Sequence, residues 1–265
     1  MKLATHIVEK PWGRVDLPPA FANDDGQQIG EIWFDAPGQS LPLLVKWLFT
    51  SEKLSIQVHP NDAQAQANGM PSGKEEMWVV VSAEPYARLG IGTTRKLSAD
   101  ELREASVSGE IEALMDWKPV QPGDYYYIPA GTVHAIGGGI TLIEVQQYAD
   151  ITYRLYDYGR PRELHLDDGV AVSVATPYDD PRSGRIGQGD LQLLCDGPHF
   201  VLWHARGEEI TKLLAKNSQQ WIIPLSGEFR HNGEILTAGS CILVDEDVKL
   251  FVTSDAAALI AYPAT

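Results

Sequence analysis

The stretch GDYYYIPAGTVH, from Gly123 to His134, has the pattern G-x5-P-x-G-x2-H. Its aromatic run favours a β-strand, the proline and glycine after it favour a turn, and the histidine follows that turn. Similar short β-branched or aromatic runs, punctuated by 24 glycines and 17 prolines, recur along the chain. Many short strands between turn residues predict an all-β fold with minor helices, in a jelly-roll sandwich or barrel.

The expected elements follow from the same local signals. Strands are predicted at residues 41–49, 54–58, 77–81, 125–129, 140–148, 200–204, 220–225, 241–244 and 257–261. The main helical signal covers residues 95–117, where Ser98 and Glu101 form a capping box and Ser108–Gly109 interrupts the helix. A weaker, polar helix is predicted at residues 61–68.

The domain organisation is predicted from a change in composition. Residues 177–189 are rich in glycine, proline and charge, which is typical of a linker. We therefore expect a larger N-terminal domain, residues 1–175, with a helical insertion at about residues 95–117. A smaller domain, residues 190–265, follows it. The turn-and-strand rhythm of residues 120–129 returns weakly at residues 224–244, which fits two copies of a small barrel.

Composition excludes several functional classes. The chain has 265 residues, with 21 Lys+Arg against 36 Asp+Glu and a net charge of −15, so a nucleic-acid partner is not expected. Cys195 and Cys241 are too few for a disulfide framework or a cysteine zinc site. No apolar run approaches the ~20 residues that span a bilayer, and no secretory signal is visible. We expect a soluble, cytoplasmic protein without a membrane partner, and the sequence assigns no oligomeric state.

Metal-binding side chains gather in three segments. In QVHP, residues 57–60, strand alternation puts Gln57 and His59 on one face, about 7 Å apart. In GKEEMW, residues 73–78, a carboxylate enters a predicted strand, and His134 ends the opening motif. Imidazole, carboxylate and amide oxygen on neighbouring strands suit zinc or another first-row divalent ion. The other histidines lack such partners, and we expect them to pack or face solvent: His6, His165, His199, His204 and His231.

These segments resemble a known family. The pattern at residues 123–134 is the second sequence motif of the cupin superfamily. Within it, the chain resembles the class I, zinc-dependent mannose-6-phosphate isomerases over about residues 10–175. The segments that carry this resemblance are LSIQVHPND (54–62), GKEEMW (73–78), EVQQYADITYRLYD (144–157), PWG (11–13) and GEIW (30–33). The resemblance implies a bicupin, with a double-stranded β-helix fold and one metal-loaded barrel.

The resemblance also implies a set of site residues. One zinc ion per chain would be held by Gln57, His59, Glu76 and His134. The implied catalytic residues are Arg154, Lys74 and Glu144, and the implied substrate contacts are Ser55, Lys46 and Asp150. The implied substrate is a small sugar phosphate, and the reaction interconverts mannose 6-phosphate and fructose 6-phosphate. Without the resemblance, Lys46 and Lys74 could form surface salt bridges, and Arg154 a structural pair with Asp150 or Asp157.

Aldose–ketose isomerisation explains why such residue types are needed. It moves a proton between adjacent carbons and leaves negative charge on an enediolate oxygen, which a divalent metal can stabilise. A base must lift the carbon-bound proton and return it one atom away. Because like charge from zinc and an arginine disfavours an ammonium group, we expect a lowered pKa for the lysine. Which residue is the base stays open.

Some positions depart from the family pattern. Arg14 stands where a glycine is usual, and residues 34–39 (FDAPGQ) replace a serine- and histidine-containing loop that lies near the site mouth in the family. We therefore consider a shifted sugar range, an iron-dependent oxidation or a non-catalytic sugar-binding cupin as alternatives. After Pro198 no histidine pair has metal-ligand spacing, so the second domain is expected to be metal-free.

Overall fold

The computed structural model describes residues 1–21, 26–214, 219–244 and 249–264. Its N-terminal part is built from two antiparallel sheets. The seven-stranded sheet has the order β1 (Ala4–Arg14), β2 (Ile29–Asp35), β3 (Leu43–Thr50), β10 (Ile140–Gln147), β5 (Glu76–Ala83), β8 (Asp124–Ile128) and β12 (Gly184–Arg185). The five-stranded sheet has the order β11 (Tyr153–Tyr156), β4 (Ile56–Val58), β9 (His134–Ile136), β6 (Arg88–Thr93) and β7 (Met115–Pro119).

The C-terminal part repeats this two-sheet arrangement on a smaller scale. A second five-stranded sheet has the order β13 (Leu191–Asp196), β14 (Phe200–Arg206), β20 (Ala257–Pro263), β15 (Gln220–Ser226) and β18 (Ile242–Val244). A three-stranded sheet contains β17 (Glu234–Leu236), β16 (Phe229–His231) and β19 (Phe251–Val252). We call the strands before residue 186 the N-terminal unit and those after residue 190 the C-terminal unit. The predicted domain boundaries themselves stay a prediction.

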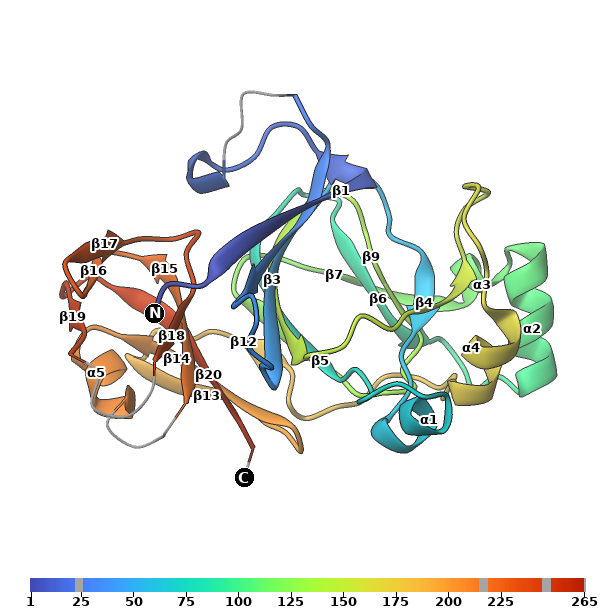
Figure 1. Cartoon of the computed structure of the whole chain (residues 1–265). Helices are drawn as coiled ribbons and strands as arrows, with labels where there is room; N and C mark the ends of the chain where they lie inside the picture. The colour runs from blue at the N-terminus through green and yellow to red at the C-terminus, as the bar shows by residue number, and fades with distance from the viewer. Residues whose placement is uncertain (22–25, 215–218, 245–248, 265) are drawn as a thin grey trace.

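The few helices lie outside the sheets. They are η1 (Pro19–Phe21), α1 (Asp62–Ala67), α2 (Ala99–Ser108), α3 (Ile111–Leu114), α4 (Leu166–Val172) and α5 (Glu208–Leu214). In Figure 1, α2, α3 and α4 cover the end of the molecule farthest from the C-terminal unit. Within the described residues, no helix is both long enough and apolar enough to cross a membrane.

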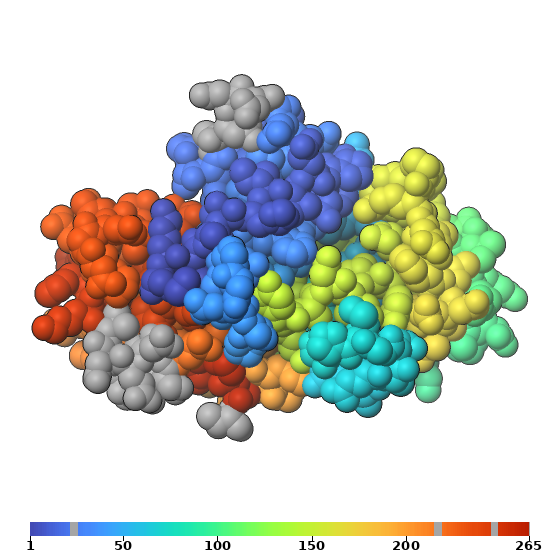
Figure 2. All heavy atoms as spheres, in the orientation of Figure 1, coloured from blue at the N-terminus to red at the C-terminus, as the bar shows by residue number. Residues whose placement is uncertain are grey.

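Three clusters of apolar side chains hold the helices and sheets together as successive layers. One cluster joins α2 and α4 to the first five-stranded sheet, and a second lies between the two N-terminal sheets. A third joins the outer face of the seven-stranded sheet to the C-terminal sheet. The strands β3 and β10 are therefore buried along their whole length. In Figures 1 and 2 the red and orange C-terminal unit lies directly against the blue N-terminal strands.

The all-β prediction with minor helices is confirmed, and all nine predicted strands are present with shifted ends. The helix at residues 61–68 forms with Asn61 as its N-cap, and Ser98 and Glu101 make both capping-box hydrogen bonds. The prediction was wrong at the end of the 95–117 helix, because residues from Met115 onward pair as β7 with β6. The predicted linker at residues 177–189 contains β12, which pairs with β8. The strands that were not predicted are β1, β2, β6, β7, β9, β11, β12, β13, β16, β17 and β19.

Candidate metal centre and active site

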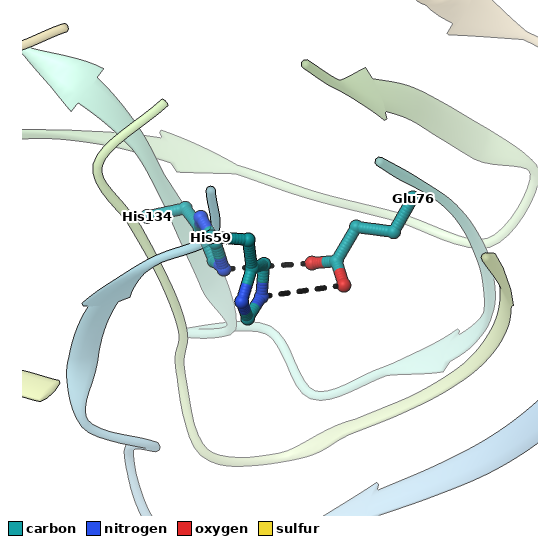
Figure 3. A group of neighbouring side chains, drawn as sticks. All are labelled: His59, Glu76 and His134. Carbon is teal, nitrogen blue, oxygen red and sulfur yellow. Dashed lines mark ion pairs between the residues drawn. The ribbon is translucent and has the colours of Figure 1, made fainter. Parts of the chain in front are cut away.

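Three predicted metal ligands meet at one point inside the N-terminal unit. His59 directly follows β4, Glu76 begins β5 and His134 begins β9. The two carboxylate oxygens of Glu76 lie 3.5 Å from His59 Nε2 and 3.4 Å from His134 Nε2. Figure 3 shows both imidazole rings pointing at this carboxylate. All three side chains are buried, so the arrangement is isolated from bulk water.

The surroundings of the two rings prepare them to bind a cation. His59 Nδ1 lies 2.7 Å from the carbonyl oxygen of Ile151, and His134 Nδ1 lies 2.8 Å from that of Thr132. Because a carbonyl only accepts, each Nδ1 carries the proton and each Nε2 keeps a lone pair. Burial, and after it Lys74, lowers the pKa of His59 to about 3, and burial lowers the pKa of His134. Both rings are thus neutral, as metal ligation requires.

Glu76 provides an independent test of whether a metal ion fits. Its Oε1 atom is buried and has no hydrogen-bond partner among the described residues. A buried carboxylate oxygen without a partner is costly, and a divalent cation would satisfy it. Two neutral imidazole nitrogens and a carboxylate form a donor set that zinc prefers. The donors of the centre therefore fit a zinc ion.

The fourth predicted ligand, Gln57, adjoins the other three. Gln57 is paired with His134 in the β4–β9 register, and its Nε2 lies 3.3 Å from His134 Nε2. Its Oε1 accepts a hydrogen bond from Ser55 Oγ at 3.1 Å. Exchanging the amide oxygen and nitrogen would turn the oxygen toward His134 while Ser55 Oγ accepts from the nitrogen. The residue can therefore supply the neutral oxygen that the prediction assigns to it.

A chain of buried charges extends from the metal centre. Lys74 Nζ lies 2.5 Å from Glu76 Oε2, 3.1 Å from His59 Nε2 and 3.9 Å from Glu144 Oε1. Glu144 Oε1 also pairs with Lys46 Nζ at 3.3 Å. The Glu144 Oε2 atom accepts from Trp78 Nε1 at 3.0 Å. Lys46 and Lys74 are each only 4% exposed, so the interpretation as surface salt bridges is wrong for both.

The pKa directions in this chain differ from the expectation. Burial opposes the charge of Lys74, but Glu144 and Glu76 outweigh burial and raise the pKa of Lys74. The expected lowering depends on like charge from zinc and an arginine, whereas the two carboxylates that flank the ammonium group shift the pKa in the opposite direction. Burial, and then the negative charge of Glu76, raises the pKa of Glu144. Among these buried charges, the Glu144 carboxyl therefore holds its proton more tightly than an ordinary glutamate does.

Strand register explains why these residues meet. In the seven-stranded sheet, Glu144 lies opposite Lys46 on one side and Trp78 on the other. In the facing sheet, Gln57 lies between His134 and Arg154. Directly opposed residues of antiparallel strands share a face. Two polar rows, one from each sheet, therefore border the same space between the sheets.

That space is a cavity of about 220 Å³. Five of its lining residues are cations and three are acids: Lys10, Lys46, Lys74, Arg154 and Arg162, with Glu31, Glu144 and Asp150. Ser55 and Gln57 also line it, so the cavity brings the predicted substrate contacts beside the metal centre. The cavity is polar and has a surplus of positive charge, which suits a small hydroxylated anion.

Arg154 keeps its guanidinium group available in this cavity. No described carboxylate lies within ion-pair distance of it, although Asp150 lines the same cavity. Asp157 instead pairs with Arg160 at 3.1 Å and with Arg162 at 2.6 Å. The alternative in which Arg154 forms a structural ion pair with Asp150 or Asp157 is therefore not found.

Sequence reasoning missed several residues of the cavity. They are Lys10, Trp12, Glu31, Thr152, Arg162 and His165. His165 had been expected to pack or face solvent, but its Nδ1 accepts from the backbone N–H of Arg154 at 3.2 Å. Recognising β1 and β2 as strands would have indicated Lys10, Trp12 and Glu31, which lie on them, and Lys10 pairs with Glu31 at 3.4 Å. By contrast, no residue of the 34–39 segment lines the cavity.

Comparison of the sequence with known proteins shows which family the chain resembles. Residues 20–85 match the catalytic domain of type I phosphomannose isomerase. This chain resembles the type I phosphomannose isomerases. The predicted resemblance is therefore confirmed. The chain is 36% identical over 181 residues to the mannose-6-phosphate isomerase of Streptococcus mutans, covering 65% of this chain and 57% of that protein. It is 43% identical over 164 residues to mannose-6-phosphate isomerase ManA of Bacillus subtilis, covering 56% and 51%.

The matches thus span about half to three-fifths of the relatives' own length. Solved structures extend the likeness of the fold to the whole chain. The mannose 6-phosphate isomerase from Bacillus subtilis aligns with a TM-score of 0.81 at 23% identity, covering 98% of both chains. A zinc-bound mannose 6-phosphate isomerase aligns with a TM-score of 0.75 at 15% identity, covering 100% of this chain and 99% of that one. The likeness of fold to these solved structures therefore includes the C-terminal unit.

Proposed function

We propose that this chain is a zinc-dependent isomerase that interconverts mannose 6-phosphate and fructose 6-phosphate through an enediolate. One observation carries the proposal: a buried His59–Glu76–His134 centre adjoins a cavity in which Lys46, Lys74, Glu144 and Arg154 converge. The likeness to proteins named mannose-6-phosphate isomerases supports the choice of sugar phosphate. The match of residues 20–85 to a catalytic domain supports an enzymatic role.

The proposed zinc ligands are Gln57, His59, Glu76 and His134, which would hold one ion per chain. When bound, the ion would supply Lewis-acid stabilisation of the negative charge that develops on the sugar oxygens. The unpartnered oxygen of Glu76 and the two neutral rings support this assignment. A zinc-bound relative with the same fold is consistent with it.

Proton transfer falls to Glu144 and Lys74 in this proposal. Glu144 is buried, holds its proton more tightly than usual and lies between two lysines, so it can exchange a proton with a carbon atom in the cavity. Lys74 stays an ammonium group, which can donate to a sugar oxygen as negative charge develops there. Lys46 orients the Glu144 carboxylate from the far side.

Substrate binding uses the remaining polar groups. Arg154 pairs with no carboxylate of the described residues and would contact the oxygens that become charged in the enediolate. Ser55 and Asp150 would bind sugar hydroxyl groups, as a hydroxyl and a carboxylate both do. Arg162 and Lys10 add positive charge for the phosphate. We propose a small-molecule partner in the cytoplasm rather than nucleic acid or membrane, because the net charge is −15 and both buried cysteines are free thiols.

The test is conversion of mannose 6-phosphate to fructose 6-phosphate by protein whose metal content has been counted. We expect about one zinc per chain and a conversion that a chelator abolishes and added zinc restores. Bound zinc without conversion would contradict the reaction and leave the metal centre. His59→Ala and His134→Ala should each lose zinc and activity together, whereas His6→Ala, at an exposed position, should lose neither. Retained zinc in both site variants would overturn the ligand assignment.

A further inference from the structure

Glu75 stands between two residues of the proposed site and points away from them. Alternate side chains of a strand face opposite sides of the sheet. Lys74 and Glu76 pair with each other at the metal centre, whereas Glu75 contacts residues on the opposite side, toward the C-terminal unit. Its carboxylate accepts a hydrogen bond from the hydroxyl of Tyr127 and lies 3.9 Å from His199 Nε2. Its backbone N–H donates to Gln147 Oε1 at 2.9 Å.

Tyr127 is held on several sides by groups outside the barrel interior. Its side chain is fully buried on β8. The guanidinium of Arg182 lies 3.8 Å from the ring centroid, and the ring of Phe200 lies 5.8 Å away. A Cβ atom on Gly197 would lie 3.1 Å from the Tyr127 hydroxyl oxygen. Burial, and then Glu75, raises the pKa of Tyr127, so the hydroxyl keeps its proton and remains a donor.

The segment before β5 is fastened at further points. The N–H of Gly73 donates to Asp62 Oδ1 at 2.8 Å, and Gln147 Nε2 donates to the same oxygen at 2.9 Å. The Nδ1 atom of His199 lies 3.9 Å from the other oxygen of Asp62. His199 of the C-terminal unit thus lies between the carboxylates of Asp62 and Glu75. These contacts join the C-terminal unit to Glu75 and, through Asp62, to Gly73.

We propose that Tyr127 and Glu75 are positioning residues through which the C-terminal unit sets the placement of Glu76 and Lys74. The inference rests on the proposed function for what Glu76 and Lys74 do. A hydrogen bond to a carboxylate is among the stronger ones, and Glu75 is bonded covalently to both site residues. A displacement of Glu75 would therefore also displace Lys74 and Glu76. Supporting contacts of this kind typically change metal affinity or activity by 10–100-fold.

The decisive variant is Tyr127→Phe, which removes the hydroxyl and keeps the ring. We expect its Kd for zinc, measured against a chelating indicator, to rise about 10-fold. We expect kcat to fall by about 10-fold, with KM for mannose 6-phosphate changed less than about 2-fold. Tyr126→Phe is the matched control, because Tyr126 is the preceding residue of β8 and lies opposite Trp78 on the other face of the strand. It should keep the zinc Kd and kcat of the unmodified protein.

Two further variants separate positioning from a loss of stability. Glu75→Ala should weaken zinc binding as Tyr127→Phe does, and the double variant should be no worse than either single one. Gly197→Ala changes only the C-terminal unit, and the added methyl group should displace the Tyr127 hydroxyl and raise the zinc Kd about 3-fold. Additive losses in the double variant would contradict action through Glu75.

The zinc measurements keep this inference distinct from the proposed function, because they need no turnover. Weaker zinc binding in Tyr127→Phe, in a protein that converts no mannose 6-phosphate, would support the positioning role and remove the proposed reaction. Equal zinc Kd and kcat in Tyr127→Phe and Tyr126→Phe would overturn the inference even if the isomerase reaction is found. If Tyr127→Phe does not fold, the Glu75→Ala and Gly197→Ala measurements decide by the same criteria.

Discussion

The buried carboxylates of the centre differ because of their neighbours. Lys74 and His59 lower the pKa of Glu76 far below its usual range although burial opposes this, whereas burial and Glu76 itself raise the pKa of Glu144. Two neighbouring buried acids thereby differ, since the proton is held less tightly by Glu76 and more tightly by Glu144. Pairs of acids whose surroundings push their pKa values apart are typical of acid–base catalysis. This separation is the residue-scale basis of the proposed reaction.

Replacing Glu144 should therefore affect turnover without removing the metal. Glu144→Gln keeps the shape of the side chain and removes its ability to exchange a proton. We expect kcat to fall by roughly 10²–10⁴-fold while the zinc content stays that of the unmodified protein. Steady-state kinetics and metal analysis check this, with Glu110→Gln, an exposed position, as the control. Full activity in Glu144→Gln would show that another group moves the proton.

His204 gives a prediction about stability that is independent of the metal centre. It is 2% exposed, its Nδ1 has no hydrogen-bond partner among the described residues, and burial lowers its pKa to about 4. The unfolded chain takes up this proton near pH 6.5 and the folded chain only near pH 4. The free energy of unfolding should therefore decrease as the pH falls from 6.5 to 4, by at most about 2 kcal/mol at pH 5.

His204→Leu should remove this part of the pH dependence. Urea unfolding at pH 7 and pH 5 measures the loss of stability between the two conditions. The variant should lose up to about 2 kcal/mol less than the unmodified protein. His6→Leu, at an exposed position, should keep the unmodified pH dependence. Identical losses in His204→Leu and His6→Leu would mean that His204 does not resist protonation in the fold.

Secondary-structure elements show two kinds of determinant. The helix α2 is specified locally, since Ser98 Oγ accepts from the N–H of Glu101 and the Glu101 carboxylate accepts from the N–H of Ser98. The strands β3 and β10 are specified by pairing, since both faces of each are buried. Lys46 and Glu144 face the cavity, while alternate residues such as Val45 and Val145 pack toward the C-terminal unit. A one-residue slip of β10 would exchange these two faces.

The local determinant of α2 is testable by itself. Ser98→Ala removes the N-cap side chain and should lower the free energy of unfolding by about 1 kcal/mol. Ser108→Ala, at the other end of the same helix, should change it less, because the Ser108 hydroxyl makes two long bonds of 3.3 Å, one to the carbonyl of Ala105 and one from the N–H of Glu110. Denaturant unfolding of both variants makes the comparison. Equal effects would contradict a special role of the capping box.

At the scale of the whole molecule, the two units share one apolar core. Strands of the seven-stranded sheet and of the C-terminal sheet contribute buried side chains to the same cluster. The chain start reinforces this contact, since the N–H of Leu3 donates to the carbonyl of Cys241 at 2.9 Å. The N–H of Leu243 donates to the carbonyl of Met1 at 2.8 Å. We therefore expect the units to unfold together.

Leu259→Ala tests this coupling. Leu259 lies on β20, is fully buried and belongs to the shared cluster. Its truncation should lower the free energy of unfolding by about 2–5 kcal/mol. The loss of the proposed isomerase activity and the loss of circular dichroism should keep one common midpoint in denaturant. An early loss of part of the circular dichroism signal with activity retained would show that the units unfold separately.

The local pattern was enough to single out His59 and His134 as candidate metal ligands. It also predicted the turn at Pro129–Gly131, the nine strands and the capped helix. Each of these signals lies within a few neighbouring residues, where strand alternation and capping act. The resemblance of five short segments added Glu76, Lys74 and Arg154. The local pattern did not predict β1 or its partner β2. The cavity residues Lys10 and Glu31 were therefore missed, because they contact each other across this pair of strands.

Tertiary structure alone decided the chemistry of the buried charges. Lys46 and Glu144 are neighbours because β3 and β10 pair, although they are far apart in the chain. Burial on both faces removes the alternation of polar and apolar residues that would have shown which side chains point inward. The raised pKa of Lys74 and the contact of Glu75 with Tyr127 depend on carboxylates and rings brought together by that pairing. The sequence by itself determined which metal-binding groups the chain offers, and the packed sheets determined their neighbours and so their charge.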